Sequence, residues 1–236
     1  MRKLITLAAG LALVGSAAAS ITEVYSWGPD VAIPDNSAAG VSDVRNIAGS
    51  AITTITDVDV RIFVERVSGG WNGDLYVTLA HDSGFAVLFN RVGKRDTGSP
   101  GVPPGTSSTV GYSDDGMNVI LDDDADADVH YYRYTLFGNH TSTLATGIPL
   151  TGTWQPDGRN LDPTAPAIDY VGDPRAAMLS VFNGLDANGT WTLFASDRAS
   201  GDTHKLTSWA LVITGVPEPT SLVLLSLAGL GLLRRR

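Results

Sequence analysis

Alternating apolar and polar residues dominate the middle of the chain. Between 57 and 65 an apolar residue stands at every second position, which is the pattern of a half-buried strand. The same period of two returns at 75–79, and 85–92 is predicted to be another strand. Because turn-forming residues lie between these two segments, the three strands are predicted to pair as an antiparallel meander.

Further strand patterns follow at 117–121, 131–137, 190–195 and 208–214. One stretch rich in glycine and proline precedes 117–121, and a second follows 131–137. The first of these, at 93–116, sustains neither a period of two nor one of 3.6, and it is predicted to be a long loop. No amphipathic helix of ten or more residues is predicted between the two ends of the chain.

We therefore expect an all-β fold, in the form of a jelly-roll-like antiparallel β-sandwich. The apolar faces of the strands would form the core between two sheets, with Trp191 and Trp209 as its large buried anchors. An N-terminal signal helix and a short C-terminal apolar helix are expected to flank the sandwich.

The N-terminus has the three regions of a secretory signal peptide. Two basic residues precede an apolar stretch at 4–14, and small residues follow it. Segment 1–19 is therefore predicted to be removed by signal peptidase, with Ala17 and Ala19 at the cleavage site.

The C-terminus combines a proline-containing motif, a short apolar segment and a basic end. The twelve mainly apolar residues of 222–233 would rise only about 18 Å as a helix, against a hydrocarbon core of about 30 Å. We therefore expect a sorting segment held briefly in the membrane rather than a permanent span. The predicted boundaries are a sandwich at 20–215 and a sorting and anchor segment at 216–236. The residues of this signal are Pro217, Glu218, Pro219, Arg234, Arg235 and Arg236.

This tail resembles the PEP-CTERM sorting signal of bacteria. In that family a membrane enzyme, exosortase, recognises the tail and removes it. The resemblance implies a protein of a Gram-negative-type bacterium that is exported and transiently anchored in the inner membrane. Its destination would be the cell envelope or the extracellular matrix.

Three sets of residues in the body, in this order, resemble the proprotein convertase P domain, also called the Homo B domain. The first is Gly73-Asp74-Leu75 after an alternating strand, and the second is 118–123 with 152–156 downstream. The resemblance covers about residues 30–214 and implies a jelly-roll β-sandwich. The third and most specific set comprises Phe182-Asn183-Gly184, Asp186 to Leu193, Asp197, Gly201-Asp202 and Leu206 to Trp209.

P domains commonly follow a subtilisin-like catalytic domain, so the resemblance also implies an association with serine proteolysis. The residues outside the predicted sandwich are too few for such a domain. Ser107 lies in the long loop without the strand-turn-helix elbow of a nucleophile. A triad assembled in space remains the enzymatic alternative. The histidines, which lack metalloprotease spacing and are expected to be ordinary polar surface residues, are His81, His130, His140 and His204.

Composition argues against nucleic-acid binding and against cysteine chemistry. The 236 residues carry a formal net charge of −9, so the chain has no basic field for a phosphate backbone and nucleic-acid binding is not expected. The sequence has no cysteine, which excludes disulfides, a thiolate nucleophile and a cysteine-based zinc site.

The acidic run at 122–128 is the candidate metal site. Closely spaced carboxylates repel each other unless a hard cation gathers them, and calcium takes six to eight oxygen ligands. Ala127 and Arg133 occupy the positions where an EF-hand needs glycine and glutamate. A solvated acidic loop is the alternative. The candidate calcium ligands are Asp122, Asp123, Asp124, Asp126 and Asp128.

These observations predict an exported, non-catalytic β-sandwich protein with a binding or structural function. Its ligand would be a surface polysaccharide or another protein. The alternative is a protease-associated accessory subunit or a hydrolase. A third hypothesis is adhesion through exposed tryptophans such as Trp27, Trp71 or Trp154.

Overall fold

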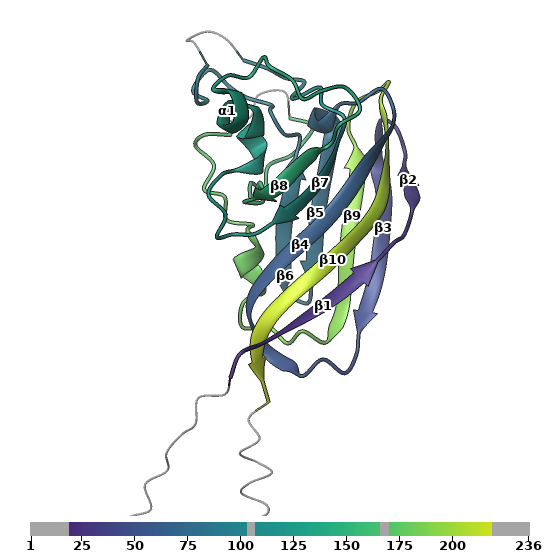
Figure 1. Cartoon of the computed structure of the whole chain (residues 1–236), viewed down its shortest axis with the longest axis vertical. Helices are drawn as coiled ribbons and strands as arrows, with labels where there is room; N and C mark the ends of the chain where they lie inside the picture. The colour runs from purple at the N-terminus through teal and green to yellow at the C-terminus, as the bar shows by residue number, and fades with distance from the viewer. Residues whose placement is uncertain (1–18, 103–106, 166–169, 219–236) are drawn as a thin grey trace, which may run out of the picture. The chain divides into compact units, whose positions relative to one another are not determined.

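The described part of the chain contains ten β-strands and four short helices (Figure 1). The structure is a computed structural model that describes residues 19–102, 107–165 and 170–218. The helices are η1 (Asn72–Asp74), η2 (Val129–Tyr131), α1 (Tyr132–Phe137) and η3 (Leu179–Phe182). The strands are β1 (Ile21–Trp27), β2 (Val31–Ile33), β3 (Ser37–Ile47), β4 (Ile52–Ser68), β5 (Leu75–His81), β6 (Gly84–Asn90), β7 (Gly116–Leu121), β8 (Leu150–Trp154), β9 (Gly189–Asp197) and β10 (Thr203–Pro217).

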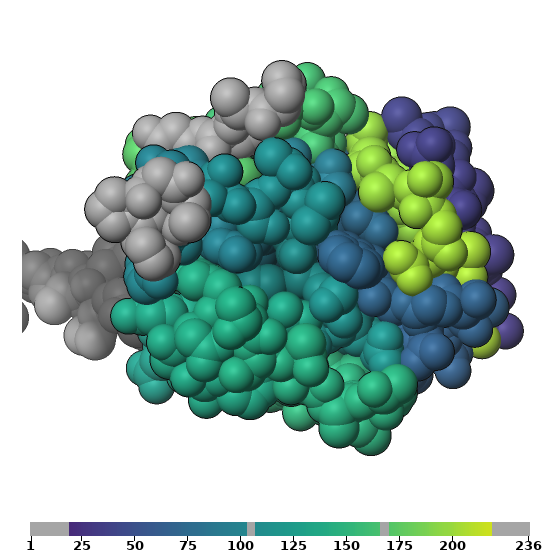
Figure 2. All heavy atoms as spheres, turned by 90° about the horizontal axis from the view of Figure 1, so that it is seen from above, coloured from purple at the N-terminus to yellow at the C-terminus, as the bar shows by residue number. Residues whose placement is uncertain are grey.

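The strands form two sheets packed face to face. The six-stranded sheet has the order β1-β10-β4-β7-β8, with β2 also paired to β10, and the four-stranded sheet has the order β3-β9-β5-β6. This arrangement confirms the all-β sandwich. Seen from above, the loops of the middle of the chain, in teal and green, fill much of this end of the molecule (Figure 2).

One pair of strands departs from the expected antiparallel arrangement. Strands β7 and β8 are parallel, in register from Met117 with Leu150 to Leu121 with Trp154. Parallel neighbours need a long crossover connection, and the segment 122–149, which contains η2 and α1, supplies it. The expectation of an entirely antiparallel sandwich was therefore wrong at this edge, and the jelly-roll assignment stays a prediction.

The period of two in the sequence separates the two faces of β4. Val58, Val60, Ile62 and Val64 are at most 2% exposed and belong to the core between the sheets. The residues between them are half-buried or exposed on the opposite face. The predicted anchors Trp191 and Trp209 are also buried, at 0% and 1% exposure.

The segment predicted as a strand at 131–137 is helical. Its aromatic residues favour a strand on propensity alone, but the side chain of Asp128 accepts a hydrogen bond from the His130 amide at the start of η2. Gly138 then ends α1 in the left-handed conformation. These local caps and the burial of Tyr132 and Arg133 outweigh the propensity of the segment.

Strands β1, β2, β3 and β8 were missing from the sequence-based prediction. In β1 every residue is half-buried or exposed, and β3 is rich in small residues and ends in a single buried isoleucine. Strands without a clear apolar face lack the signal on which such a prediction depends. Each of the four pairs with one strand only.

The predicted ends of the chain fall largely outside the described residues. Ala17 and the signal segment up to residue 18 lie outside them, as do Pro219 and the terminal arginines. Pro217 is the last residue of β10, so the sandwich extends past the predicted boundary at 215. Within the described ranges no helix is long and apolar enough to cross a membrane.

A part-buried hydrogen bond joins the two sheets next to their β1 and β3 edges. The indole Nε1 of Trp209 in β10 donates to Oδ2 of Asp43 in β3 at 2.6 Å. Arg45 forms an ion pair with the same oxygen at 2.9 Å, and the ring of Trp27 packs on that of Trp209 with centroids 4.4 Å apart. This contact fixes the orientation of an aromatic pair that lies beside the groove described below.

Asp43→Ala is expected to lower the free energy of unfolding by about 1–3 kcal/mol, because it leaves a buried indole donor without an acceptor. Urea unfolding measures the change. Val44→Ala is the matched control, because Val44 is the next residue of β3 and its side chain is 58% exposed. Equal effects of the two substitutions would contradict the assigned role of Asp43.

Candidate functional site

The acidic run after β7 divides into structural and free carboxylates. Asp123 accepts hydrogen bonds from the amides of Leu179 and Ser180 at the start of η3. Asp128 accepts from the His130 amide and pairs with Arg159 at 2.7 Å. Asp122 accepts from the amide of Asp124. Most of the run is therefore already used in holding loops.

Asp124 and Asp126 are exposed, and no hydrogen bond from a described residue reaches their carboxylates. They line a small hollow of about 310 Å³, together with Thr135 of α1 and Thr153 and Trp154 of β8. In the described ranges no three acidic or histidine side chains are arranged to hold a metal ion. Calcium binding at the run stays a prediction.

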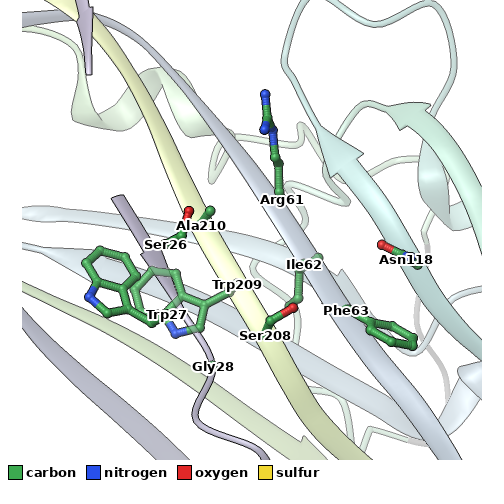
Figure 3. Close-up of a pocket in the computed structure, with 10 residues that line it drawn as sticks. All are labelled: Ser26, Trp27, Gly28, Arg61, Ile62, Phe63, Asn118, Ser208, Trp209 and Ala210. Carbon is green, nitrogen blue, oxygen red and sulfur yellow. The ribbon is translucent and has the colours of Figure 1, made fainter. Parts of the chain in front are cut away.

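A larger groove lies on the outer face of the six-stranded sheet. Its volume is about 400 Å³, and residues from β1, β4, β7 and β10 line it (Figure 3). Because side chains alternate along a strand, Ser26, Ala210, Arg61, Phe63 and Asn118 face outward here. Their neighbours Trp27, Ile62 and Trp209 also line the groove, although they stand at the inward positions of their strands.

The strand register explains how these residues meet. Ser208, Phe63 and Asn118 lie side by side in one row across β10, β4 and β7. Ser26, Ala210 and Arg61 lie in the next row. The register of β10 shifts between Leu206 and Ser208, and such a bulge bends its strand and re-aims side chains. In Figure 3 the ring of Phe63 lies toward Asn118, and Arg61 extends from the same strand.

Carboxylates accompany the groove on the same face of β4. Burial, followed by repulsion from Asp57 and Asp122, raises the pKa of Asp59 to about 6. Burial and the charges of Asp122 and Asp124 also raise the pKa of Asp57. This part of the sheet face is therefore negative at neutral pH, and Arg61 provides the nearby positive charge that partly offsets it.

The four histidines are buried, which contradicts the expectation of surface residues. Their exposures are 3% for His81, 0% for His130, 7% for His140 and 1% for His204. Each packs in the interior because a polar partner satisfies at least one ring nitrogen, as buried polar groups require. Among the described residues no serine hydroxyl is hydrogen-bonded to a histidine.

His130 is the centre of one buried network. Its Nδ1 lies 2.5 Å from Oδ2 of Asp157, and its Nε2 lies 2.6 Å from the carbonyl oxygen of Lys94. Arg159 pairs with both Asp157 and Asp128. Both ring nitrogens of His130 are thus engaged, and the network ties the loop after β8 to the loop after β6.

A second network joins the ends of β5, β9 and β10. Nδ1 of His204 lies 3.1 Å from Oδ2 of Asp197, and Arg91 pairs with Asp74 at 3.4 Å. Burial, followed by repulsion from Asp197, raises the pKa of Asp74 to about 7. Asp202 accepts from the Gly70 amide at 2.8 Å. These aspartates, singled out by the resemblance, hold turns and strand ends together.

The three tryptophans considered for adhesion are buried or half-buried. Trp154 is 5% exposed, and its indole donates to the carbonyl oxygen of Thr151. Trp27 is half-buried against Trp209, and Trp71 donates to the carbonyl oxygen of Val110. The hypothesis of adhesion through exposed, stacked tryptophans is therefore wrong for Trp154, which is buried, and stays a prediction for the half-buried Trp27 and Trp71.

Sequence reasoning missed the groove. Arg61 and Phe63 were visible in the strand pattern as the outward positions of 57–65, and an outward phenylalanine among polar residues was the available signal. The partners Ser26, Asn118 and Ser208 come from strands distant in sequence. Only the pairing of β1, β10, β4 and β7 brings them together.

Comparisons with known proteins do not assign a family. No family model matches the chain, and no curated protein matches it. Among solved structures, one similar chain comes from the crystal structure of the complex of Aeromonas sobria serine protease and the chaperone. The identity is 15% and the TM-score 0.41, over 84% of this chain and 27% of that chain. A similarity at this level carries no inference about shared fold or function.

The raised pKa of Asp74 predicts a pH-dependent contribution to stability. A carboxyl whose pKa is higher in the folded state, about 7 against an ordinary 3.8, favours folding when protonated. This contribution is lost as pH rises through about 7. Asp74→Asn is expected to reduce the fall in urea midpoint between pH 5 and pH 8. Asp126→Asn, at an exposed carboxylate, should leave that difference unchanged, and the same slope in all three proteins would contradict the assignment.

Calcium binding at the acidic run predicts a higher thermal unfolding midpoint with calcium, reversed by a chelator. The double variant Asp122→Asn/Asp124→Asn is expected to abolish the rise. Asp162→Asn is the control, because Asp162 is an exposed aspartate of another loop. A midpoint that calcium does not change would overturn the prediction.

Proposed function

We propose that this protein is a non-catalytic binding module whose ligand contacts the groove on the outer face of the six-stranded sheet. The observation that carries the proposal is the groove itself. Polar side chains without hydrogen-bond partners among the described residues surround the half-buried ring of Phe63 there. Binding sites characteristically combine an apolar surface with a few such polar groups.

The placement of the ionisable groups also supports binding over catalysis. A general base needs a nitrogen or oxygen that can reach a substrate proton. His130 has both ring nitrogens engaged inside the protein, and His204 is fully enclosed next to Asp197. The groove itself contains no histidine or carboxylate among its lining residues.

We further propose that the module acts outside the cytoplasm, in the cell envelope or the extracellular matrix. The predicted signal peptide and the sorting tail support this proposal. Signal peptidase and exosortase would act on the two ends, and the membrane would hold the tail until it is processed.

The alternative function is that of a protease-associated accessory subunit, which the resemblance to the P domain implies. It differs from the first proposal in its partner, which would be a subtilisin-like enzyme. Co-expression with such an enzyme from the same organism separates the two. Stable co-purification and a higher yield of active protease would favour the accessory subunit.

The double variant Phe63→Ala/Asn118→Ala is expected to reduce retention of the protein on an isolated cell-envelope fraction by about tenfold or more, because central contacts dominate binding. Co-sedimentation measures retention. Phe85→Ala is the matched control, since Phe85 is 39% exposed and belongs to the other sheet. Unchanged retention of the double variant would exclude the groove, and hydrolysis of protein or glycan substrates by the purified chain would contradict a non-catalytic function.

A further inference from the structure

The groove and the smaller hollow lie on the same face of the six-stranded sheet. Ala210, Arg61, Ile120 and Thr153 are successive partners across β10, β4, β7 and β8, so their side chains point to the same side. Arg61 and Ala210 line the groove, and Thr153 lines the hollow. In this row only Ile120, which is half-buried, lies between the groove and the hollow.

The two concavities together are elongated across the strands. Neighbouring strands are about 4.8 Å apart, so the distance from β1 to β8 is about 19 Å. The long direction of this surface runs perpendicular to the strands, over four strand spacings. A linear ligand of several units fits this shape better than a single small molecule.

The groove offers hydrogen-bonding groups that the chain does not use. No side-chain hydrogen bond within the described residues involves Arg61, Asn118, Ser208 or Ser26. Arginine only donates, whereas an amide and a hydroxyl both donate and accept. Phe63 supplies a flat, half-buried ring in the same row as Asn118 and Ser208.

The hollow at the other end adds acceptors. Asp124 and Asp126 present free carboxylates there, and Thr135 and Thr153 present hydroxyls. The whole surface thus combines donors, acceptors and an aromatic ring. A sugar has hydroxyls that both donate and accept and a pyranose face of C–H groups that packs on an aromatic ring.

The charges of this surface disfavour a polyanion over most of its length and a cation beside Arg61. Asp57, Asp59, Asp124 and Asp126 repel a polyanion along most of the surface. Arg61 lies between them and the row of Phe63, and it repels a cation at the centre of the groove. A neutral, hydroxylated chain meets neither penalty.

We propose that the outer face of the six-stranded sheet binds one chain of a neutral polysaccharide, which crosses the strands from the groove to the hollow. The inference rests on the proposed binding function and specifies its ligand class. Phe63 stacks on a sugar ring, Arg61 and Asn118 donate to sugar oxygens, and Asp126 and Thr153 contact a later unit of the same chain.

Affinity electrophoresis of the purified full chain tests the proposal. The gels contain a neutral polymer (hydroxyethylcellulose, mixed-linkage β-glucan, galactomannan or dextran), a polyanion (polygalacturonate or alginate) or polylysine. At least one neutral polymer is expected to retard the protein. Retardation by no neutral polymer, or by charged polymers alone, would overturn the proposal.

Phe63→Ala is expected to weaken binding to the retarding polymer about tenfold, and Phe85→Ala is expected to leave it unchanged. Unchanged thermal unfolding midpoints show that the variants are folded. Oligosaccharides of the same polymer should bind more tightly with length until they span both concavities. Asp126→Ala/Thr153→Ala should remove the gain from the later units. Equal binding by wild type and Phe63→Ala would overturn the proposal.

The two proposals fail in different ways. If Phe63→Ala/Asn118→Ala loses retention on the envelope fraction while no neutral polysaccharide binds, the groove has a protein ligand. The binding function then stands and the polysaccharide does not. If the substitutions affect neither retention nor polysaccharide binding, both proposals fail.

Discussion

The pairing of β4 with β10 is the constraint on which the rest of the structure depends. These are the two longest strands, and they are neighbours in the middle of the six-stranded sheet. Their inward residues, such as Ile62 and Trp209, belong to the core. Their outward residues, such as Phe63 and Ser208, line the groove. One register therefore sets both the hydrophobic packing and the geometry of the binding surface.

A register shift in the pairing of β10 with β4 also determines which side chains reach the core and which reach the groove. The register shift between Leu206 and Ser208 comes just before Trp209, so the indole still reaches the core while Ser208 joins the row of Phe63. A one-residue slip in a strand moves every side chain to the opposite face. The hydrogen bond from Trp209 to Asp43 and the packing of Trp27 on Trp209 hold the register of β10 at this point.

Buried polar networks hold the loops in place, as the apolar core holds the strands. The chain has no cysteine, so disulfides do not restrain its long connections. The His130 network instead ties together the loops after β6 and β8, and the His204 network joins three strand ends. Such networks stabilise only when most of their members are satisfied. This explains why residues that resemble catalytic groups have structural roles here.

The sequence by itself determined the fold class and the central strands. The period of two in β4, β5, β9 and β10 was readable because each of these strands has one face in the core. Strand β6 was readable as a continuous apolar run, because both of its faces are buried. The burial of Trp191 and Trp209 followed from the same pattern.

Tertiary structure decided the helix at 131–137, the burial of the histidines and the position of the groove. The segment 131–137 became helical because of a cap at Asp128 and contacts with distant residues. The histidines entered the interior because the carboxylates of partners such as Asp157 and Asp197 lie beside their rings there. The groove exists because strand pairing places Ser26, Arg61, Asn118 and Ser208 side by side. Periodicity reports which face of a strand is buried, but only the order and register of the strands determine which exposed residues meet.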